Sequence, residues 1–437
     1  MKTIITAKIR LHTTPEQFAA LRATQLAYRD ALNYVSQYAF AHGNMSNAAR
    51  LQDGTYDEIR VRFHLPSQMT CSVSRQVGAT YKGLWTKVKA NTAARKAGVT
   101  KKRYKGLDHA PTFVSPTLTY QNRKDYTFKN NQQVSILTLE GRVIIPYTGY
   151  RKHVERIHHG AEIGAAKLWY DKPKKTFYLL VSLELQMADP TPETQTGIAG
   201  VDVGVRYLAV TSSTRGTCTF YSGKQIVPKA NHYARLRKRL QKKGTRSATR
   251  RLVAMSGRER RLKRDANHRV SKSIVTAHPH SFIGVEHLAD IRERTRRRTG
   301  KNTSKKQRKA NHAYSKWSFA ELQSLIAYKA LLQGSMAIKV DAHYTSQACP
   351  MCGHTAPENR PRHGLLFVCK KCHYTLHADL VGARNITMRT LVVRQDWTTT
   401  GLLSVAPDGS SDEAKAARLQ RYADLRWSLE PSPVSLD

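Results

Sequence analysis

Two pairs of cysteines constrain this sequence more than any other feature. CPMC at 349–352 and CKKC at 369–372 form the pattern C-x2-C-x16-C-x2-C. Each pair supplies two soft thiolates from one tight turn, and four thiolates complete the tetrahedral shell of a zinc ribbon. We therefore predict one structural Zn²⁺ with four ligands: Cys349, Cys352, Cys369 and Cys372. A closed site of this kind performs no chemistry, so any reaction must depend on other residues.

The alternative for these cysteines is disulfide bonding, which requires an oxidising compartment. The N-terminal stretch MKTIITAKIRLHTTPEQ lacks the apolar segment and small-residue cleavage site of a secretion signal. No run of about 18 apolar residues marks a membrane span. We therefore expect a cytoplasmic protein without a membrane partner, in which the cysteines stay reduced.

The first half of the sequence predicts an antiparallel β unit interrupted by helices. Residues 1–12 alternate apolar and polar side chains, which indicates a strand, and Thr14 with Gln17 forms the capping box of a following helix. A second helix is expected at 67–90. Period-two runs then fill 111–187 and indicate strands, before a linker rich in Pro and Thr.

The second half opens with an apolar strand that carries one carboxylate, Asp202, followed by two more strand patterns. Glu286 ends another apolar strand, in SFIGVEHL, and a helix and a further strand precede the cysteines. This order suggests an RNase H-like sheet. A third acid, Asp379, stands at the start of a final helix just after the last cysteine pair.

Asp202, Glu286 and Asp379 are the candidate catalytic residues. Two strands that each present a carboxylate, with a third acid opening a helix, could hold two Mg²⁺ or Mn²⁺ ions about 4 Å apart for phosphodiester hydrolysis. Hard carboxylate oxygens suit these ions, whereas the thiolates suit zinc, so the two sites should not compete. The alternative for Asp379 is a plain helix N-cap, which is a common role for aspartate.

Positive charge indicates a nucleic-acid partner. The net charge is +42, from 73 Lys and Arg against 31 Asp and Glu, and residues 235–272 hold 16 basic residues against two acids. We predict a helical hairpin there, whose phosphate contacts come from Arg235, Arg239, Lys242, Arg250, Arg260, Arg261, Lys263 and Lys272. A second basic run, 292–309, is predicted to be a mobile loop that bound nucleic acid orders. For either run the alternative is a merely solvated face.

Several motifs in this order resemble those of the transposon-encoded TnpB family, RNA-guided nucleases with a RuvC domain that are related to type V CRISPR effectors. They are GVDVGVRYLAV, GVEHL, YTSQACPMCG, FVCKKC and HADLVGARNI. The resemblance implies a prokaryotic, nucleoid-associated endonuclease. It would bind a guide RNA from the transposon end, read a short motif beside its target DNA and cut with Asp202, Glu286 and Asp379. The family usually has Asn and Ala where this chain has Val381 and Gly382.

The resemblance also implies a multidomain α/β and β fold, in which an RNase H-like (RuvC) domain with an inserted zinc ribbon follows a β wedge domain that carries a helical recognition insert. The expected parts are the first wedge strand at 1–12, the helical recognition domain at 13–110, the wedge at 111–190, the nuclease domain at 191–346, the ribbon at 347–375, the last nuclease helix at 376–392 and a flexible tail at 393–437.

Two other functions remain compatible with the sequence. An RNA-guided DNA-binding protein or repressor would lack cleavage, and the presence of all three acids argues against it. A CRISPR-associated miniature effector would share every feature named above. A DNA-joining transposase on the same scaffold is disfavoured by the zinc ribbon between the last strand and the last helix. The sequence predicts no oligomeric state.

Overall fold

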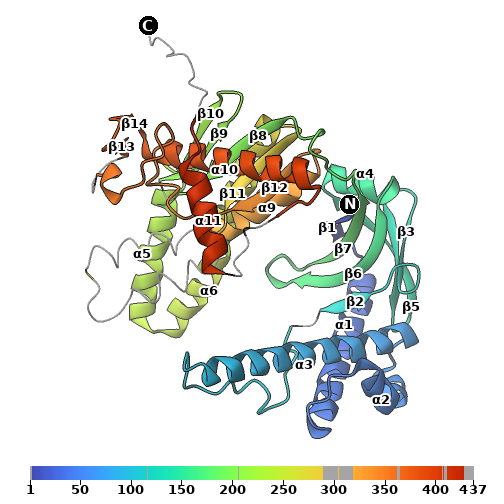
Figure 1. Cartoon of the computed structure of the whole chain (residues 1–437). Coiled ribbons are helices and arrows are strands. Elements are labelled where there is room, and N and C mark those ends of the chain that lie inside the picture. The colour runs from blue at the N-terminus through green and yellow to red at the C-terminus, as the bar shows by residue number, and fades with distance from the viewer. Residues whose placement is uncertain are drawn as a thin grey trace. The chain divides into compact units, whose positions relative to one another are not determined.

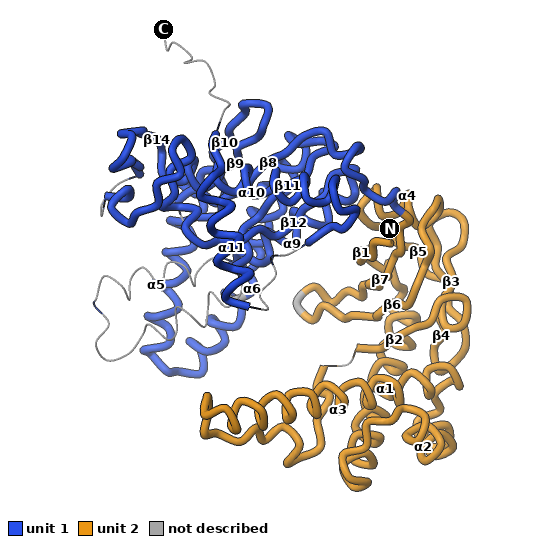
Figure 2. The backbone as a smooth tube through the Cα atoms, in the orientation of Figure 1, with its two compact units in different colours: residues 1, 187–437 blue, residues 2–186 orange. Residues whose placement is uncertain are grey.

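The chain forms two compact units, residues 2–186 and residues 187–437, the second of which also includes Met1 (Figure 2). The computed structural model describes residues 2–115, 117–204, 206–288, 304, 318–361, 365–405, 407 and 411–427. The predicted loop at 292–309 lies outside the described residues except for Ser304. Among the helices described, none has both the length and the hydrophobicity of a membrane span.

The first unit is built on one antiparallel sheet. Its strands are β1 (Lys2–Leu11), β2 (Leu118–Tyr120), β3 (Tyr126–Lys129), β4 (Gln133–Thr138), β5 (Gly141–Gly149), β6 (Glu162–Asp171) and β7 (Thr176–Gln186), in the order β2-β6-β7-β1-β5-β4-β3. The expected alternation holds in β1, where every second residue is buried. The N-terminal strand therefore lies at the centre of the sheet, between β5 and β7.

Helices of this unit are α1 (Pro15–Ala41), α2 (Ala48–Phe63), α3 (Ser67–Lys96) and α4 (Arg151–His158). The capping box is confirmed, because Thr14 accepts from the Gln17 backbone N–H while the Gln17 side chain bonds the Thr14 backbone. The sequence reasoning did not identify α2. Its buried stripe is only Leu51, Thr55 and Ile59, so its periodic signal is weak.

The second unit contains a five-stranded mixed sheet. Its strands are β8 (Gly197–Asp202), β9 (Tyr207–Ser213), β10 (Cys218–Ser222), β11 (Ser281–Glu286) and β12 (Met336–Val340), in the order β10-β9-β8-β11-β12. Strand β9 runs antiparallel to both of its neighbours, β10 and β8, whereas β8, β11 and β12 run parallel to one another. The expected mixed α/β content is thus confirmed.

Helices cover both faces of this sheet (Figure 1). They are α6 (Arg246–Ala277), α9 (Phe319–Leu331) and α10 (Ala378–Thr400), while α5 (Val227–Lys243) packs against α6. The α6 and α9 face buries Val201, Val285 and Leu322 in one core cluster. The α10 face buries a second cluster that includes Phe282 and Ile386.

Two glycines let α10 lie unusually close to the sheet. A Cβ added at Gly200 on β8 would collide with the backbone of α10 at Ala383 and Thr387. A Cβ at Gly284 on β11 would collide with the Thr390 hydroxyl. Since side chains alternate along a strand, Asp202 and Glu286 share this face with the two glycines. The two acids therefore point to the face that α10 covers.

The C-terminal region differs from the flexible tail expected from 393 onward. The last sheet helix, α10, continues to Thr400, and α11 (Asp412–Ala423) follows it. Trp427 is buried, and its backbone N–H donates to the Pro350 carbonyl over 2.7 Å. A short helix in this tail was anticipated from the sequence, but its anchoring was not, because single contacts to distant residues leave no periodic pattern.

Arg418→Met is expected to lower the free energy of unfolding by about 1–3 kcal/mol, because it removes one partner of a buried carboxylate. The Arg418 guanidinium lies 3.4 Å from Asp341, whose side chain is only 4% exposed. Arg421→Met on the same helix is the matched control. Its pair with Asp396 is about half exposed on both sides, so a change below about 0.5 kcal/mol is expected. Equal shifts of the thermal midpoint in both variants would contradict this.

Candidate functional site

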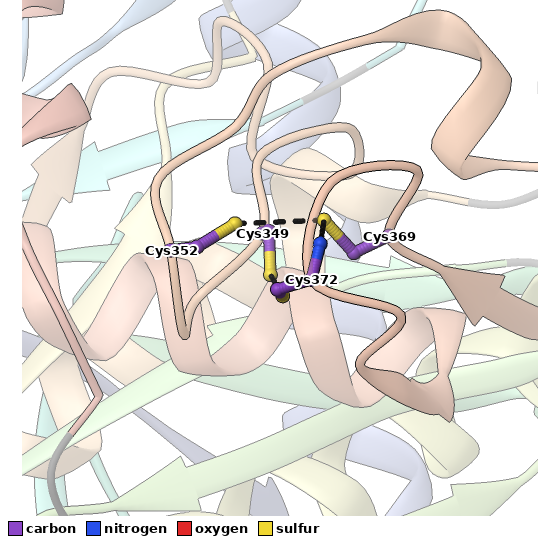
Figure 3. Close-up of side chains that lie close together, drawn as sticks. All are labelled: Cys349, Cys352, Cys369 and Cys372. Atoms are coloured by element: carbon purple, nitrogen blue, oxygen red, sulfur yellow. Dashed lines mark hydrogen bonds between the residues drawn. The ribbon is translucent and has the colours of Figure 1, made fainter.

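The four cysteines converge in one cluster, as predicted (Figure 3). Their Sγ atoms all lie within 4.8 Å of one another. The sulfurs of Cys349 and Cys372 are 3.6 Å apart, and those of Cys352 and Cys369 are 3.5 Å apart. Thiolates at about 2.3 Å from a tetrahedral zinc ion would lie about 3.8 Å from each other. The geometry therefore fits a zinc ion.

Both cysteine turns have the same backbone design. Gly353 follows the first pair with φ +74°, and His373 follows the second with φ +58°. In each turn the residue after the second cysteine donates its N–H to the carbonyl of the first, over 2.9 Å at Gly353 and 3.1 Å at His373. Burial raises the pKa of Cys369, but backbone N–H groups from Cys372 and Lys371 outweigh it and hold that pKa at about 7.

The module that carries the four cysteines, residues 347–377 and here named the zinc module for the ion that its geometry fits, is joined to the rest of the second unit by a shared core. It contains the short strands β13 (Leu366–Val368) and β14 (Thr375–His377). Cys349, Cys369 and Phe367 are buried together with Ala378 and Val381 of α10. Folding of the module and placement of the first turn of α10 are therefore coupled.

The carboxylates Asp202 and Glu286 lie side by side at the carboxyl ends of two neighbouring parallel strands. Val201 pairs with Val285, so Asp202 and Glu286 occupy the next position on β8 and β11. Adjacent strands are about 4.8 Å apart, and equivalent positions point to the same face. Both residues are partly exposed, although burial disfavours the charge of both carboxylates.

Asp379 is in the first turn of α10 and is not its N-cap. The cap is His377, whose Nδ1 accepts the Asp379 N–H over 3.3 Å. The cap interpretation of Asp379 is therefore wrong, because β14 ends at His377 and the helix begins one residue later. This leaves the Asp379 carboxylate without a capping role. It lies 3.8 Å from the Arg360 guanidinium.

Asp202 lies close enough to the other two acids for their charges to affect its pKa. Burial raises the pKa of Asp202 well above its ordinary range, and the charges of Glu286 and Asp379 raise it further. Burial also raises the pKa of Glu286, although a hydrogen bond from Thr345 opposes this. Among the described residues, only the cysteines are gathered tightly enough to meet the geometry of a bound metal. A divalent cation would relieve the repulsion between the three like charges.

Arg360 is a site residue that the sequence reasoning missed. It belongs to the zinc module, and its positive charge lowers the pKa of Asp202 as well as pairing with Asp379. Such a guanidinium could bind a phosphate beside the acids. One arginine among 73 Lys and Arg residues carries no distinguishing local signal, so only the tertiary structure identifies it.

The departure from the family motif at Gly382 lies directly against this site. A Cβ at Gly382 would be 3.1 Å from both the Asp202 Cγ and Oδ2 atoms. This contact is tighter than ordinary van der Waals packing. The glycine therefore leaves room for the Asp202 carboxylate beside α10.

A predicted basic hairpin is present as α5 and α6, joined at Gly244. Its apolar seam includes Leu240, Ala248 and Met255. Seven of the eight predicted phosphate-contacting side chains are exposed: Arg235, Arg239, Lys242, Arg250, Arg260, Arg261 and Lys272. Lys263 differs, because its side chain is 15% exposed and pairs with Glu259 over 2.8 Å.

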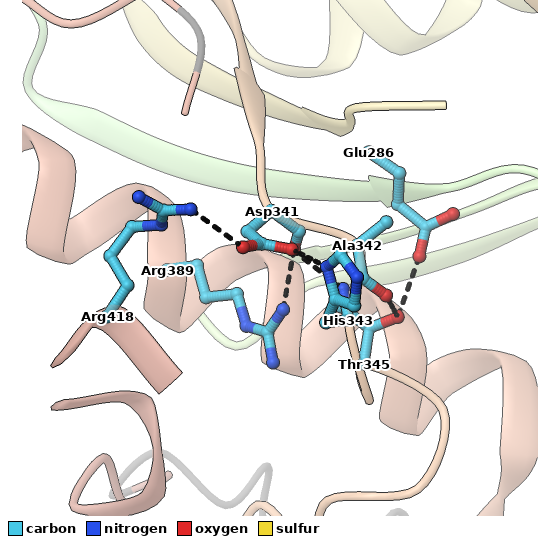
Figure 4. Close-up of polar contacts among 7 residues, drawn as sticks. All are labelled: Glu286, Asp341, Ala342, His343, Thr345, Arg389 and Arg418. Carbon is cyan, nitrogen blue, oxygen red and sulfur yellow. Dashed lines mark hydrogen bonds and ion pairs between the residues drawn. The ribbon is translucent and has the colours of Figure 1, made fainter. Parts of the chain in front are cut away.

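A polar network surrounds the end of β12 next to Glu286 (Figure 4). The Asp341 carboxylate accepts the His343 backbone N–H over 2.9 Å and lies near Arg418. Buried Arg389 donates to the Asp341 carbonyl over 2.5 Å and stacks on Tyr422 of α11, 4.4 Å from the ring centroid. The network joins β12, α10 and α11 beside the acid site.

Family comparisons match both halves of this unit. Residues 179–289 match the model described as "Probable transposase" (OrfB_IS605), and residues 319–386 match the model "Cas12f1-like, TNB domain". The first match includes Asp202 and Glu286, and the second includes all four cysteines and Asp379. The resemblance noted in the sequence is therefore confirmed, and it extends to Cas12f-type proteins.

Individual relatives agree with these matches. The chain is 29% identical over 218 residues to "Putative RNA-guided DNA endonuclease InsQ" of Escherichia coli (strain K12), covering 48% of this chain and 53% of the relative. It is also 29% identical over 270 residues to the CRISPR-associated endodeoxyribonuclease Cas12f1 of Sulfoacidibacillus thermotolerans, covering 56% and 58%. The chain thus spans little more than half of these relatives. The solved mini-RNA-guided endonuclease CRISPR-Cas_phi3 aligns with TM-score 0.49 at 11% identity, covering 89% of this chain and 92% of that one.

Proposed function

We propose that this protein is an RNA-guided DNA endonuclease that hydrolyses phosphodiester bonds at Asp202, Glu286 and Asp379. The observation that carries the proposal is the convergence of two adjacent parallel strand ends and the first turn of α10 on one group of three acids. The strand order β10-β9-β8-β11-β12 supports an RNase H-like, RuvC-type assignment of the sheet. Retention of all three acids favours an enzyme over a DNA-binding repressor.

Asp202, whose pKa both other acids influence, would hold divalent cations together with Glu286 and Asp379. Mg²⁺ or Mn²⁺ bound there would activate water and stabilise the charge that develops on the phosphate. Arg360 pairs with Asp379. Once cations neutralise the acids, the Arg360 guanidinium would be released from Asp379 and would bind a phosphate oxygen.

Zinc is the metal we assign to the cysteine cluster, where it has a structural role. Its four ligands leave no open coordination position, and its core is shared with the start of α10. The ion would therefore fix the position of Asp379 without taking part in the reaction.

Nucleic acid is the substrate and the partner we propose. One relative is named a putative RNA-guided DNA endonuclease and the other a CRISPR-associated endodeoxyribonuclease. The exposed basic side chains of α5 and α6 supply a surface for phosphates. We assign the sheet and helices of residues 2–186 to a wedge domain with a helical recognition insert, which would bind the guide RNA and a short motif beside the target. The guide RNA would come from the transposon end.

Sequencing the RNA that co-purifies with the protein, followed by plasmid cleavage, tests this function. A defined RNA species with a constant scaffold and a variable guide segment is expected, and plasmids that match the variable segment should be cut in the presence of Mg²⁺. Plasmids without the match should stay intact. Purification without any enriched RNA, or cleavage that ignores the plasmid sequence, would contradict RNA guidance.

Salt dependence of RNA binding should identify which basic residues touch phosphates. Arg260→Gln is expected to reduce the slope of log affinity against log salt by about 0.7–0.9, the value for one lost phosphate contact. Lys263→Gln, one turn along the same helix, is the matched control. Because Glu259 already neutralises Lys263, a smaller change is expected. Filter binding across a range of NaCl concentrations measures both slopes, and identical slopes would show that the ion pair has no influence.

A further inference from the structure

The carboxylate of Glu286 is held by a residue outside its own strand. Its backbone is fixed by the parallel pairing of β11 with β12 and by the Gln323 side chain, which donates to the Glu286 carbonyl over 2.9 Å. Its carboxylate accepts a hydrogen bond from the Thr345 hydroxyl, with 2.7 Å between Oγ1 and Oε1 (Figure 4). The Thr345 side chain is 3% exposed, so little water competes for this contact.

A hydroxyl donates only one hydrogen, and Thr345 has two acceptors in reach. The Ala342 carbonyl lies 3.2 Å from Oγ1, whereas the Glu286 oxygen lies 2.7 Å away and is charged when ionised. Hydrogen bonds to ionised acceptors are shorter and about twice as strong as neutral ones. The hydrogen therefore goes to Glu286, which leaves the second carboxylate oxygen available to a cation.

Thr345 is itself anchored on two sides. The Asn385 side-chain amide donates to the Thr345 carbonyl over 2.6 Å and to the Ala348 carbonyl over 2.9 Å. Asn385 is buried on α10, the helix that carries Asp379. The same turn leads directly into Cys349, and buried Asn359 of the zinc module donates to the Gln347 carbonyl over 2.8 Å.

We propose that Thr345 is a positioning residue that holds the Glu286 carboxylate in place for a divalent cation, and that the zinc module and α10 fix Thr345 through residues 345–349. The inference rests on the proposed function, since it assigns Glu286 to a cation site. The helix α10 would therefore fix the positions of both acids. Asp379 is part of α10, and Glu286 is held to α10 through Thr345 and Asn385.

Mn²⁺ binding to the zinc-loaded, nuclease-treated full-length protein, measured from the electron paramagnetic resonance signal of free Mn²⁺, tests the proposal without requiring DNA cleavage. Mn²⁺ that the unaltered protein binds and Glu286→Gln does not bind is assigned to the acid site. Thr345→Val removes the hydroxyl at nearly constant volume and is expected to weaken this site about tenfold, as loss of a hydrogen bond to a metal ligand does. Thr345→Ser restores the hydroxyl and should bind within about twofold of the unaltered protein.

Thr355→Val is the matched control, because Thr355 is an exposed residue of the same module whose hydroxyl donates to the Gly353 carbonyl. It should leave Mn²⁺ affinity unchanged. Zinc content and the thermal midpoint of every variant check folding, and Thr345→Ala replaces the valine variant if that one loses zinc. Unchanged affinity in Thr345→Val or Thr345→Ala, or equal weakening in Thr345→Ser, would overturn the proposal. Absence of any Glu286-dependent Mn²⁺ would do the same.

Plasmid cleavage tests the proposed function independently of Mn²⁺ binding. If the proposed function is wrong, the unaltered protein with its co-purified RNA will leave matched plasmids intact. Mn²⁺ binding that responds to Thr345 while matched plasmids remain uncut would retain the positioning role and reject RNA-guided cleavage.

Discussion

Asp379→Asn is expected to reduce DNA cleavage by about 100-fold or more while leaving RNA-guided binding of the target unchanged. The substitution removes one negative charge from the three acids around Asp202, and the loss of a metal ligand costs several kcal/mol of transition-state stabilisation. Asp202→Ala and Glu286→Ala should behave alike. Plasmid cleavage with Mg²⁺ measures the loss, and a gel-shift of the same target measures binding.

Asp396→Asn is the control for this prediction. It makes the same chemical change on the same helix, but Asp396 is about half exposed and pairs with Arg421 away from the acids. Normal cleavage is expected from it. Near-normal cleavage by Asp379→Asn would remove Asp379 from the site and leave two acids for two ions.

The same site should respond to pH in a defined direction. Since burial and the neighbouring acids raise the pKa of Asp202, the carboxyl retains its proton to a higher pH than an exposed aspartate. A cation must displace that proton, so the Mg²⁺ concentration needed for half-maximal cleavage should rise as the pH falls.

Cys369→Ser is expected to abolish zinc binding and unfold the zinc module, with loss of cleavage as a consequence. Elemental analysis should find one zinc per chain in the unaltered protein and close to none in the variant. Structural zinc sites contribute about 10–16 kcal/mol of apparent binding free energy in small zinc-finger peptides, so serine cannot replace the fourth thiolate without a large loss. Cys369 is fully buried and shares its core with Ala378 and Val381, so the first turn of α10 should become labile.

Cys218→Ser is the control, because Cys218 is an exposed free cysteine on β10. It should retain full zinc content and cleavage. Hydrogen exchange locates the effect: residues 347–380 should lose protection in Cys369→Ser, while β1 and α1 of the other unit should not change. Folded, active protein without zinc would contradict the assignment.

Several features were predictable because their signals are local in the sequence. Thr14 and Gln17 are three residues apart, and each cysteine pair lies within one turn, so spacing alone indicates the cap and the zinc ligands. Alternation along β1 and the acids at the ends of apolar strands are likewise short-range patterns. The family motifs also belong to short segments, which is why the matched models confirm the resemblance.

Two local features were not resolved by the sequence reasoning. His377 caps α10 in place of Asp379 because β14 sets where the helix begins, a difference of one or two residues that propensity does not resolve. Lys263 is neutralised because Glu259 lies next to it on the same face, whereas Arg260 points to solvent. This ion pair is an i,i+4 contact within α6, so the spacing of Glu259 and Lys263 could have indicated it, and the sequence reasoning did not use that signal.

The arrangement around the acids was decided by tertiary structure alone. Thr345 reaches Glu286 across 59 residues of sequence, and Arg360 reaches Asp379 from within the zinc module. The pairing of β11 with β12 brings the turn after β12 next to Glu286, and Asn385 of α10 holds Thr345 there. The sequence by itself determined which acids and thiolates this chain possesses. Which of them meet, and which residues hold them, was decided by strand register and helix packing, because contacts between distant segments leave no periodic trace in the chain.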